Sequence, residues 1–133
     1  MSARRLNIGI RTRAERSKAL REALRRVARG NRSSEDAGLY FESVAELRQI
    51  LTEKRLELLL AIGRHRPASV HELAGLLGRD YKNVSTDITM LERLGLVKLE
   101  AKSGKGRAQA PTVPYDEIQV TIDLRHPRAA NAA

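Results

Sequence analysis

The chain has no cysteine and no tryptophan, and aromatic residues make up only 3% of its 133 residues. Without cysteine, neither a disulfide framework nor a thiolate metal site is available. No apolar run approaches the roughly 18 residues that a membrane-spanning helix requires. The arginine-rich N-terminus also lacks the hydrophobic segment of a secretory signal. We therefore expect a soluble cytoplasmic protein with one domain, a modest core and an appendage.

Signatures of catalysis are missing as well. His65, His71 and His126 show no metal-binding spacing such as H-x-x-x-H or H-E-x-x-H. No Ser/His/Asp signature or pair of acidic residues suggests a catalytic cleft. The glycines around Lys105 lack the rest of a phosphate-binding loop, G-x-x-x-x-G-K-[ST]. We expect a protein that is not an enzyme and has no cofactor and no metal.

Positive charge is concentrated at one end of the chain. Residues 1–34 contain ten arginines and one lysine against two glutamates, a net charge of +9, which equals the formal net charge of the whole protein. The remaining residues are therefore neutral in sum. Within them, residues 79–107 carry seven basic and four acidic side chains. Such basic segments favour nucleic acid or an acidic protein as the partner.

Residues 69–95 contain the signals for two short helices separated by a tight turn. Ser69 followed by Glu72 is a capping box, and the apolar helix that it begins stops at Gly78. Asp80 is placed to cap a second helix over residues 81–94. Two short helices joined by about three residues including glycine are the helix-turn-helix signature. The predicted inward face of the second helix comprises Val84, Ile88, Leu91 and Gly95.

A strand and a basic loop follow these helices. Residues 96–100 read as a strand, residues 102–107 as the glycine-containing tip of a hairpin, and residues 108–113 as its return strand. The tip carries three cations, Lys102, Lys105 and Arg107, which suit contacts with phosphates or a narrow minor groove.

In register, L-A-x-x-L-G, V-S-x-D-I and M-L-E-R-L-G-L-V form the winged helix-turn-helix pattern. Residues 52–113 resemble the DNA-binding core of the MarR-type and ArsR-type regulators of bacteria and archaea. The longer run 40–124, with D-Y-K-N-V and P-Y-D-E-I-x-V-x-I-D-L, is similar to a small family of prokaryotic winged-helix DNA-binding proteins, some of which serve as antitoxins. The resemblance implies an α+β fold, mainly α, with a β-hairpin wing.

The polar face of the second helix is the candidate DNA-reading surface. Counting about 100° per residue from Val84 places Lys82, Thr86, Thr89 and Arg93 on the opposite face. Asn83 and Ser85 lie beside them near the N-terminus, where side chains reach base edges in the major groove. Tyr81 is placed to donate to a phosphate. The acidic residues Asp87 and Glu92 are expected to point away or to pair with Arg79 or Arg93.

The flanking segments are predicted to complete the fold. Residues 6–10 and 118–124 alternate as strands, residues 13–29 form an arginine-rich helix, and residues 39–41 are a possible short strand. Ser43 with Glu46 forms another capping box. Thr52 is expected to cap a core helix that packs through Leu56, Leu59, Leu60 and Ile62.

The expected division is a basic strand–helix extension over residues 1–34, a winged domain with a C-terminal strand over residues 39–124, and a flexible tail over residues 125–133. We expect residues 5–11 and 117–124 to pair with each other or with a second subunit. Together with the arginine-rich helix, they would build the interface of a homodimer.

Three functions agree with these patterns. The first is a dimeric, sequence-specific regulator of transcription that binds double-stranded DNA, as a repressor that can act on its own gene. The second is an antitoxin or interaction module whose basic N-terminal arm binds an acidic toxin. The third, weaker hypothesis is a nucleoid-type protein that binds DNA without sequence preference.

Overall fold

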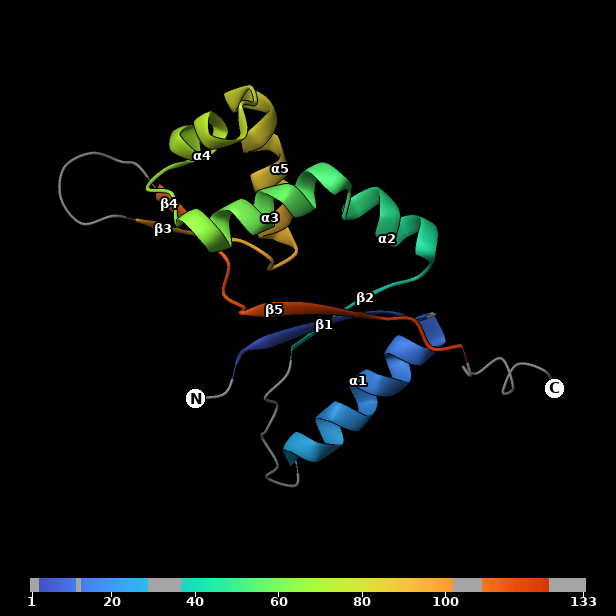
Figure 1. Ribbon diagram of the computed structural model, residues 1–133. Helices are drawn as coiled ribbons and strands as arrows, with labels where there is room; N and C mark the ends of the chain where they lie inside the picture. Colours follow the sequence, from blue (N-terminus) through green and yellow to red (C-terminus); the bar gives the residue numbers. More distant parts are fainter. Residues whose placement is uncertain (1–2, 12, 29–36, 102–108, 125–133) are drawn as a thin grey trace. The chain divides into compact units, whose positions relative to one another are not determined.

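The computed structural model describes residues 3–11, 13–28, 37–101 and 109–124 of the chain. The fold is α+β, as predicted (Figure 1). Its elements are β1 (Arg5–Ile10), α1 (Arg13–Ala28), β2 (Ala37–Phe41), α2 (Val44–Ile50), α3 (Glu53–His65), α4 (Val70–Leu77), α5 (Tyr81–Arg93), β3 (Lys98–Ala101), β4 (Gln109–Thr112) and β5 (Glu117–Thr121).

The chain divides into two compact units. Residues 50–116 form one unit, and the residues up to Gln49 form the other together with those from Glu117 onward. This division differs from the expected one, which grouped residues 39–124, because β2 and β5 both pair with β1. In the part of the chain that the structure describes, no helix is long and apolar enough to cross a membrane.

The unit formed by the two ends of the chain is built on a three-stranded sheet with β1 in the middle. Both β2 and β5 run parallel to β1, so that Ile8 lies opposite Leu39 on one side and Val120 on the other. Parallel strands require a crossover connection, which α1 provides between β1 and β2. The predicted pairing of residues 5–11 with residues 117–124 is therefore confirmed within one chain.

Two aromatic residues, Tyr40 and Phe41, lie on strand β2 of this sheet. Phe41 is buried, whereas Tyr40 is half-buried. A side-chain carbon on Gly38 would lie only 2.7 Å from the Tyr40 ring, so glycine leaves the space that the ring fills. The guanidinium of Arg11 lies 3.7 Å from the centroid of the same ring, a cation–π contact.

Helix α1 in the same unit leaves large apolar side chains uncovered. Leu20 and Leu24 are both 60% exposed, and they are one helical turn apart. The arginines Arg21 and Arg25 are also exposed. This helix therefore presents an apolar and basic surface to its surroundings.

The second unit has its core between α3, α4, α5 and the start of the hairpin. Val84, Ile88 and Leu91 are buried on α5, as predicted, while α4 contributes Leu73 and Ala74. On α3, however, the buried residues are Leu58, Leu59, Ala61 and Ile62.

The prediction for the buried face of α3 was therefore wrong in part, because Leu56 is 41% and Leu60 53% exposed. Residues 56–62 are nearly all apolar, so helical periodicity alone does not show which face of α3 is buried.

Helix starts follow the predicted caps. The hydroxyl of Ser43 accepts a hydrogen bond from the Glu46 N–H at 3.0 Å, and Thr52 accepts from the Arg55 N–H at 3.2 Å. Ser69 likewise accepts from Glu72 N–H at 3.0 Å, but the Glu72 carboxylate accepts from the N–H of Ala68 rather than from that of Ser69.

The predicted position of Gly95, on the inward face of the second helix, was wrong. It is not on the inward face of α5 but is exposed beyond the end of the helix, with φ of 82°. The N–H of Leu96 donates to Leu91 O at 2.9 Å, and that of Gly95 donates to Glu92 O at 3.0 Å. These two bonds form a Schellman motif, which requires the left-handed conformation that glycine adopts without strain.

Candidate nucleic-acid interface

The turn between α4 and α5 fixes where the second helix begins. Gly78 has φ of 64°, and the N–H of Arg79 donates to Ala74 O at 3.0 Å, which ends α4 in a Schellman motif. Two residues later, a carboxylate oxygen of Asp80 accepts hydrogen bonds from the N–H groups of Lys82, at 3.1 Å, and Asn83, at 3.3 Å. The predicted glycine stop and acidic cap are therefore both confirmed.

Helix α5 has one buried face and one polar exposed face. Most of the predicted DNA-reading side chains are exposed, and Ser85 is half-buried beside Val84. The exposed members are Tyr81, Lys82, Asn83, Thr86, Thr89 and Arg93. An exposed polar face of this length matches the dimensions of a helix in the major groove.

The hydroxyl groups of the two threonines on this face donate hydrogen bonds to backbone carbonyls of α5. Thr86 donates to Lys82 O and Thr89 donates to Ser85 O, each at 3.0 Å. In this conformation the hydroxyl oxygens can only accept, and the methyl groups remain available for contact with a thymine methyl. The other side chains of this face that can donate hydrogen bonds are those of Tyr81, Lys82, Asn83, Ser85 and Arg93.

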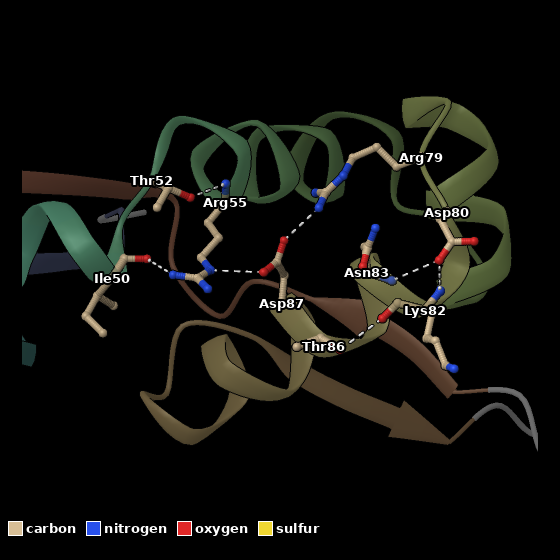
Figure 2. Close-up of polar contacts among 9 residues, drawn as sticks. All are labelled: Ile50, Thr52, Arg55, Arg79, Asp80, Lys82, Asn83, Thr86 and Asp87. Carbon is tan, nitrogen blue, oxygen red and sulfur yellow. Dashed lines mark hydrogen bonds and ion pairs between the residues drawn. The ribbon is translucent and has the colours of Figure 1, made fainter.

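Asp87 is turned away from the polar face and held by two arginines (Figure 2). Its Oδ1 accepts from Arg55 Nε at 3.0 Å, and its Oδ2 accepts from Arg79 Nη2 at 2.9 Å. The three side chains are only 13–17% exposed. Arg55 also donates from Nη1 to Ile50 O at 2.9 Å. This ion triad links α3, the turn and α5, and its net charge is positive.

The predicted pairing of Asp87 with Arg79 is thus confirmed, but Arg55 was missed. Arg55 lies 32 residues from Asp87 along the chain, and no local pattern relates the two positions.

The guanidinium nitrogen Nη1 of Arg79 is buried and has no hydrogen-bond partner among the described residues. Both carboxylate oxygens of Asp87 accept hydrogen bonds from arginines, so this acidic group does not place a negative charge on the exposed face.

An aromatic stack joins the first turns of the two helices. The imidazole of His71, on α4, lies parallel to the ring of Tyr81, the first residue of α5, with a centroid distance of 3.9 Å and an interplanar angle of 10°. Both residues are exposed, Tyr81 by 42%. No local pattern in the sequence predicts this contact, because His71 and Tyr81 lie on different helices.

The strands of the predicted wing are present. β3 and β4 pair antiparallel, with Lys98 opposite Thr112 and Ala101 opposite Gln109. Thr112 Oγ1 also donates to Lys98 O at 3.2 Å. The three cations predicted for the tip, Lys102, Lys105 and Arg107, lie outside the described residues.

Three helices followed by an antiparallel hairpin, with α4 and α5 joined by a three-residue turn, define the unit of residues 50–116 as a winged helix-turn-helix. The chain belongs to the HVO_A0114 family, whose profile matches residues 50–120. No curated protein matches the chain. A similar solved structure is that of a transcriptional regulator homologue from Pyrococcus horikoshii OT3, with 22% sequence identity, a TM-score of 0.41 and coverage of 53% of this chain and 76% of that one.

Proposed function

We propose that this protein is a sequence-specific DNA-binding regulator of transcription. The observation that carries this proposal is the exposed face of α5. It combines Lys82 and Asn83 near the helix start with two threonines along its length, while Asp87 is neutralised on another side. A helix with donors near its N-terminus and no free carboxylate among them is suited to read base edges from the major groove.

Each group has a distinct proposed role. Asn83 can pair bidentately with adenine, and Lys82 can donate to guanine. The Thr86 and Thr89 methyl groups would contact thymine, whereas the Tyr81 hydroxyl, Ser85 and Arg93 would contact the backbone. The cations of the wing tip would neutralise further phosphates beside the groove.

A homodimer fits this mode of binding. Two-fold dimers place their recognition helices in half-sites about 34–36 Å apart along the DNA. Exposed Leu20 and Leu24 on α1 provide an apolar surface that a second copy can cover. We infer that the dimer occludes an operator and so represses, with the promoter of its own gene as the first candidate.

A second candidate function is that of an antitoxin, or interaction module, of the same chain. The same helix α1 supports it, because exposed Arg21 and Arg25 flank the uncovered leucines. Such a surface fits an acidic partner protein with an apolar centre. DNA reading and partner binding can reside in one chain, because α5 and α1 belong to different units, but a second copy and a partner protein would use the same surface of α1.

Fluorescence anisotropy tests the proposal. The protein is titrated with duplex DNA from its own upstream region and with a scrambled duplex, at about 50 and about 200 mM salt. Sequence-specific binding predicts a preference for the upstream DNA of about 10³-fold or more. Weak, salt-sensitive and equal binding to both duplexes would contradict the proposal and point to the protein partner instead.

Two variants sharpen this experiment. Replacement of Lys82, Asn83 and Thr86 together by alanine removes the proposed contacts from α5 and should abolish the preference. Lys54→Ala is the matched control, because Lys54 is an exposed lysine of the same unit on α3. Equal losses in both variants would show that charge alone, and not α5, determines binding.

A further inference from the structure

Strand β5 leaves apolar side chains exposed at the edge of the three-stranded sheet. Val120 lies opposite buried Ile8 of β1 and shares its face of the sheet, yet Val120 is 49% exposed. Ile122, which follows the strand, is 53% exposed. Exposed apolar residues on an edge strand favour association with another chain. The unit that contains α1 therefore has a second uncovered apolar surface, on β5.

The two apolar surfaces are surrounded by opposite charges. Residues 13–28, which form α1, contain six basic and two acidic side chains. The exposed cations next to its leucines are Lys18, Arg21 and Arg25. Residues 116–124, by contrast, contain three acidic side chains and no basic one. Arg5 of β1 pairs with Glu117 at the start of β5, whereas Asp123 lies beyond the other end of the strand. The surface of α1 is thus complementary in charge to that of β5.

These charges decide between the ways in which two copies could cover the leucines of α1. Two α1 helices side by side would bring the basic side chains of one copy against those of the other, and like charges oppose an interface. Antiparallel pairing of two β5 strands, centred on Val120, would place Glu117 of one copy opposite Asp123 of the other, which is also repulsive. Contact of α1 with β5 combines apolar burial with opposite charge.

We propose that α1 of each copy packs across β5 of a second copy, with Leu20 and Leu24 covering Val120 and Ile122. A two-fold axis makes this contact twice in one dimer. The inference rests on the homodimer of the proposed function and adds the surface that receives α1. Because a partner protein would need the same leucines, it would have to displace β5 of the second copy.

Cysteine cross-linking tests this arrangement. The chain has no cysteine, so introduced thiols are the only ones that a bismaleimide can join. A chain that carries both Leu24→Cys and Val120→Cys should yield a covalent dimer of twice 14.8 kDa on a denaturing gel. A cross-link within one chain would show that α1 covers its own β5, and it would overturn the proposal. Absence of any cross-link would overturn it as well.

The two variants with a single cysteine are the controls. If α1 faces β5, each of them should give far less covalent dimer than the chain with both cysteines. An equal yield from Leu24→Cys alone would show that two α1 helices lie together. An equal yield from Val120→Cys alone would show that two β5 strands lie together, and either result would overturn the proposal.

Charge reversal tests the acidic side of the contact. Asp123→Lys should weaken dimer association by about tenfold, because it places a cation against the basic surface of α1. Glu57→Lys is the matched control, since it makes the same change at an exposed position of α3. Sedimentation equilibrium measures both dissociation constants. An Asp123→Lys protein that associates as tightly as Glu57→Lys would overturn the proposal.

Neither experiment uses DNA, so this inference and the proposed function fail separately. A protein that cross-links through α1 and β5 but binds neither duplex would contradict the DNA-binding function alone. A protein that prefers its upstream duplex but cross-links through α1 alone would overturn this inference alone.

Discussion

Asp87 shows how single residues make the exposed face of α5 compatible with DNA. A carboxylate in the middle of a recognition helix would repel phosphates, but here Arg55 and Arg79 hold it on another side. Partly buried ion pairs cost desolvation energy, and their loss leaves uncompensated charge. The triad therefore keeps the Asp87 charge off the exposed face and connects α5 to α3 and to the turn before α5.

Removal of the Asp87 charge should destabilise the winged unit. Asp87→Asn leaves two arginines of low exposure without a counter-charge, and we expect the free energy of unfolding to fall by about 3 kcal/mol. Urea denaturation followed by circular dichroism measures the change. Arg79→Met is the comparison, because the Arg55–Asp87 pair remains and the loss should be smaller. Losses below about 1 kcal/mol for Asp87→Asn would contradict a structural role of the triad.

Asn83 carries the sharpest prediction about base reading. Asn83→Ala should weaken binding to the cognate duplex by about 1–3 kcal/mol and leave binding to random DNA nearly unchanged. Anisotropy titrations with both duplexes measure the two losses, with Lys54→Ala as control. Equal losses on cognate and random DNA would exclude Asn83 from base readout.

At the scale of elements, the helix-turn-helix is determined by local signals. Ser69 and Asp80 cap the two helices, and glycines in the left-handed conformation end them. Because each signal involves residues within one or two turns of each other, the sequence predicts these boundaries well. α5 ends at Arg93, one residue before the predicted end.

Gly75 within α4 and Gly78 directly after it should respond to alanine with opposite signs. Gly78 has φ of 64°, so Gly78→Ala places a side chain in the left-handed conformation, and we expect a loss of about 1 kcal/mol in stability. Gly75 lies within the helix, where alanine is favoured by about 1 kcal/mol over glycine. Neither new side-chain carbon would have a neighbour within 4 Å. Thermal or urea unfolding of the two variants compares them, and a stabilised Gly78→Ala would refute the conformational argument.

At the scale of the whole molecule, the exposed leucines of α1 are the proposed surface for assembly. If a second copy covers Leu20 and Leu24, Leu24→Glu should convert a dimer into a monomer of 14.8 kDa. Burial of a carboxylate without a partner opposes the interface. Light scattering coupled to size-exclusion chromatography measures the mass.

Ser17→Glu is the control for this variant, because it adds the same charge at an exposed polar position of α1. Its mass should remain that of the wild type. A wild-type protein that is monomeric at all concentrations would remove the dimer from the proposal and leave the surface of α1 to a different partner.

The amino-acid sequence by itself determined the helix caps, the glycine stops, the order of the winged unit and the exposed face of α5. Hydrogen bonds within a turn and the 3.6-residue period depend only on neighbouring residues, so these features can be read along the chain. The alternation of residues 118–124 likewise predicted the strand β5.

Only the tertiary structure decided which distant segments meet. It paired β1 with both β2 and β5, turned Leu58 and Ala61 of α3 inward in place of Leu56 and Leu60, and brought Arg55 to Asp87 and His71 to Tyr81. These contacts follow from the packing of whole elements, and no spacing along the chain encodes them, because many alternative partners satisfy the same local pattern.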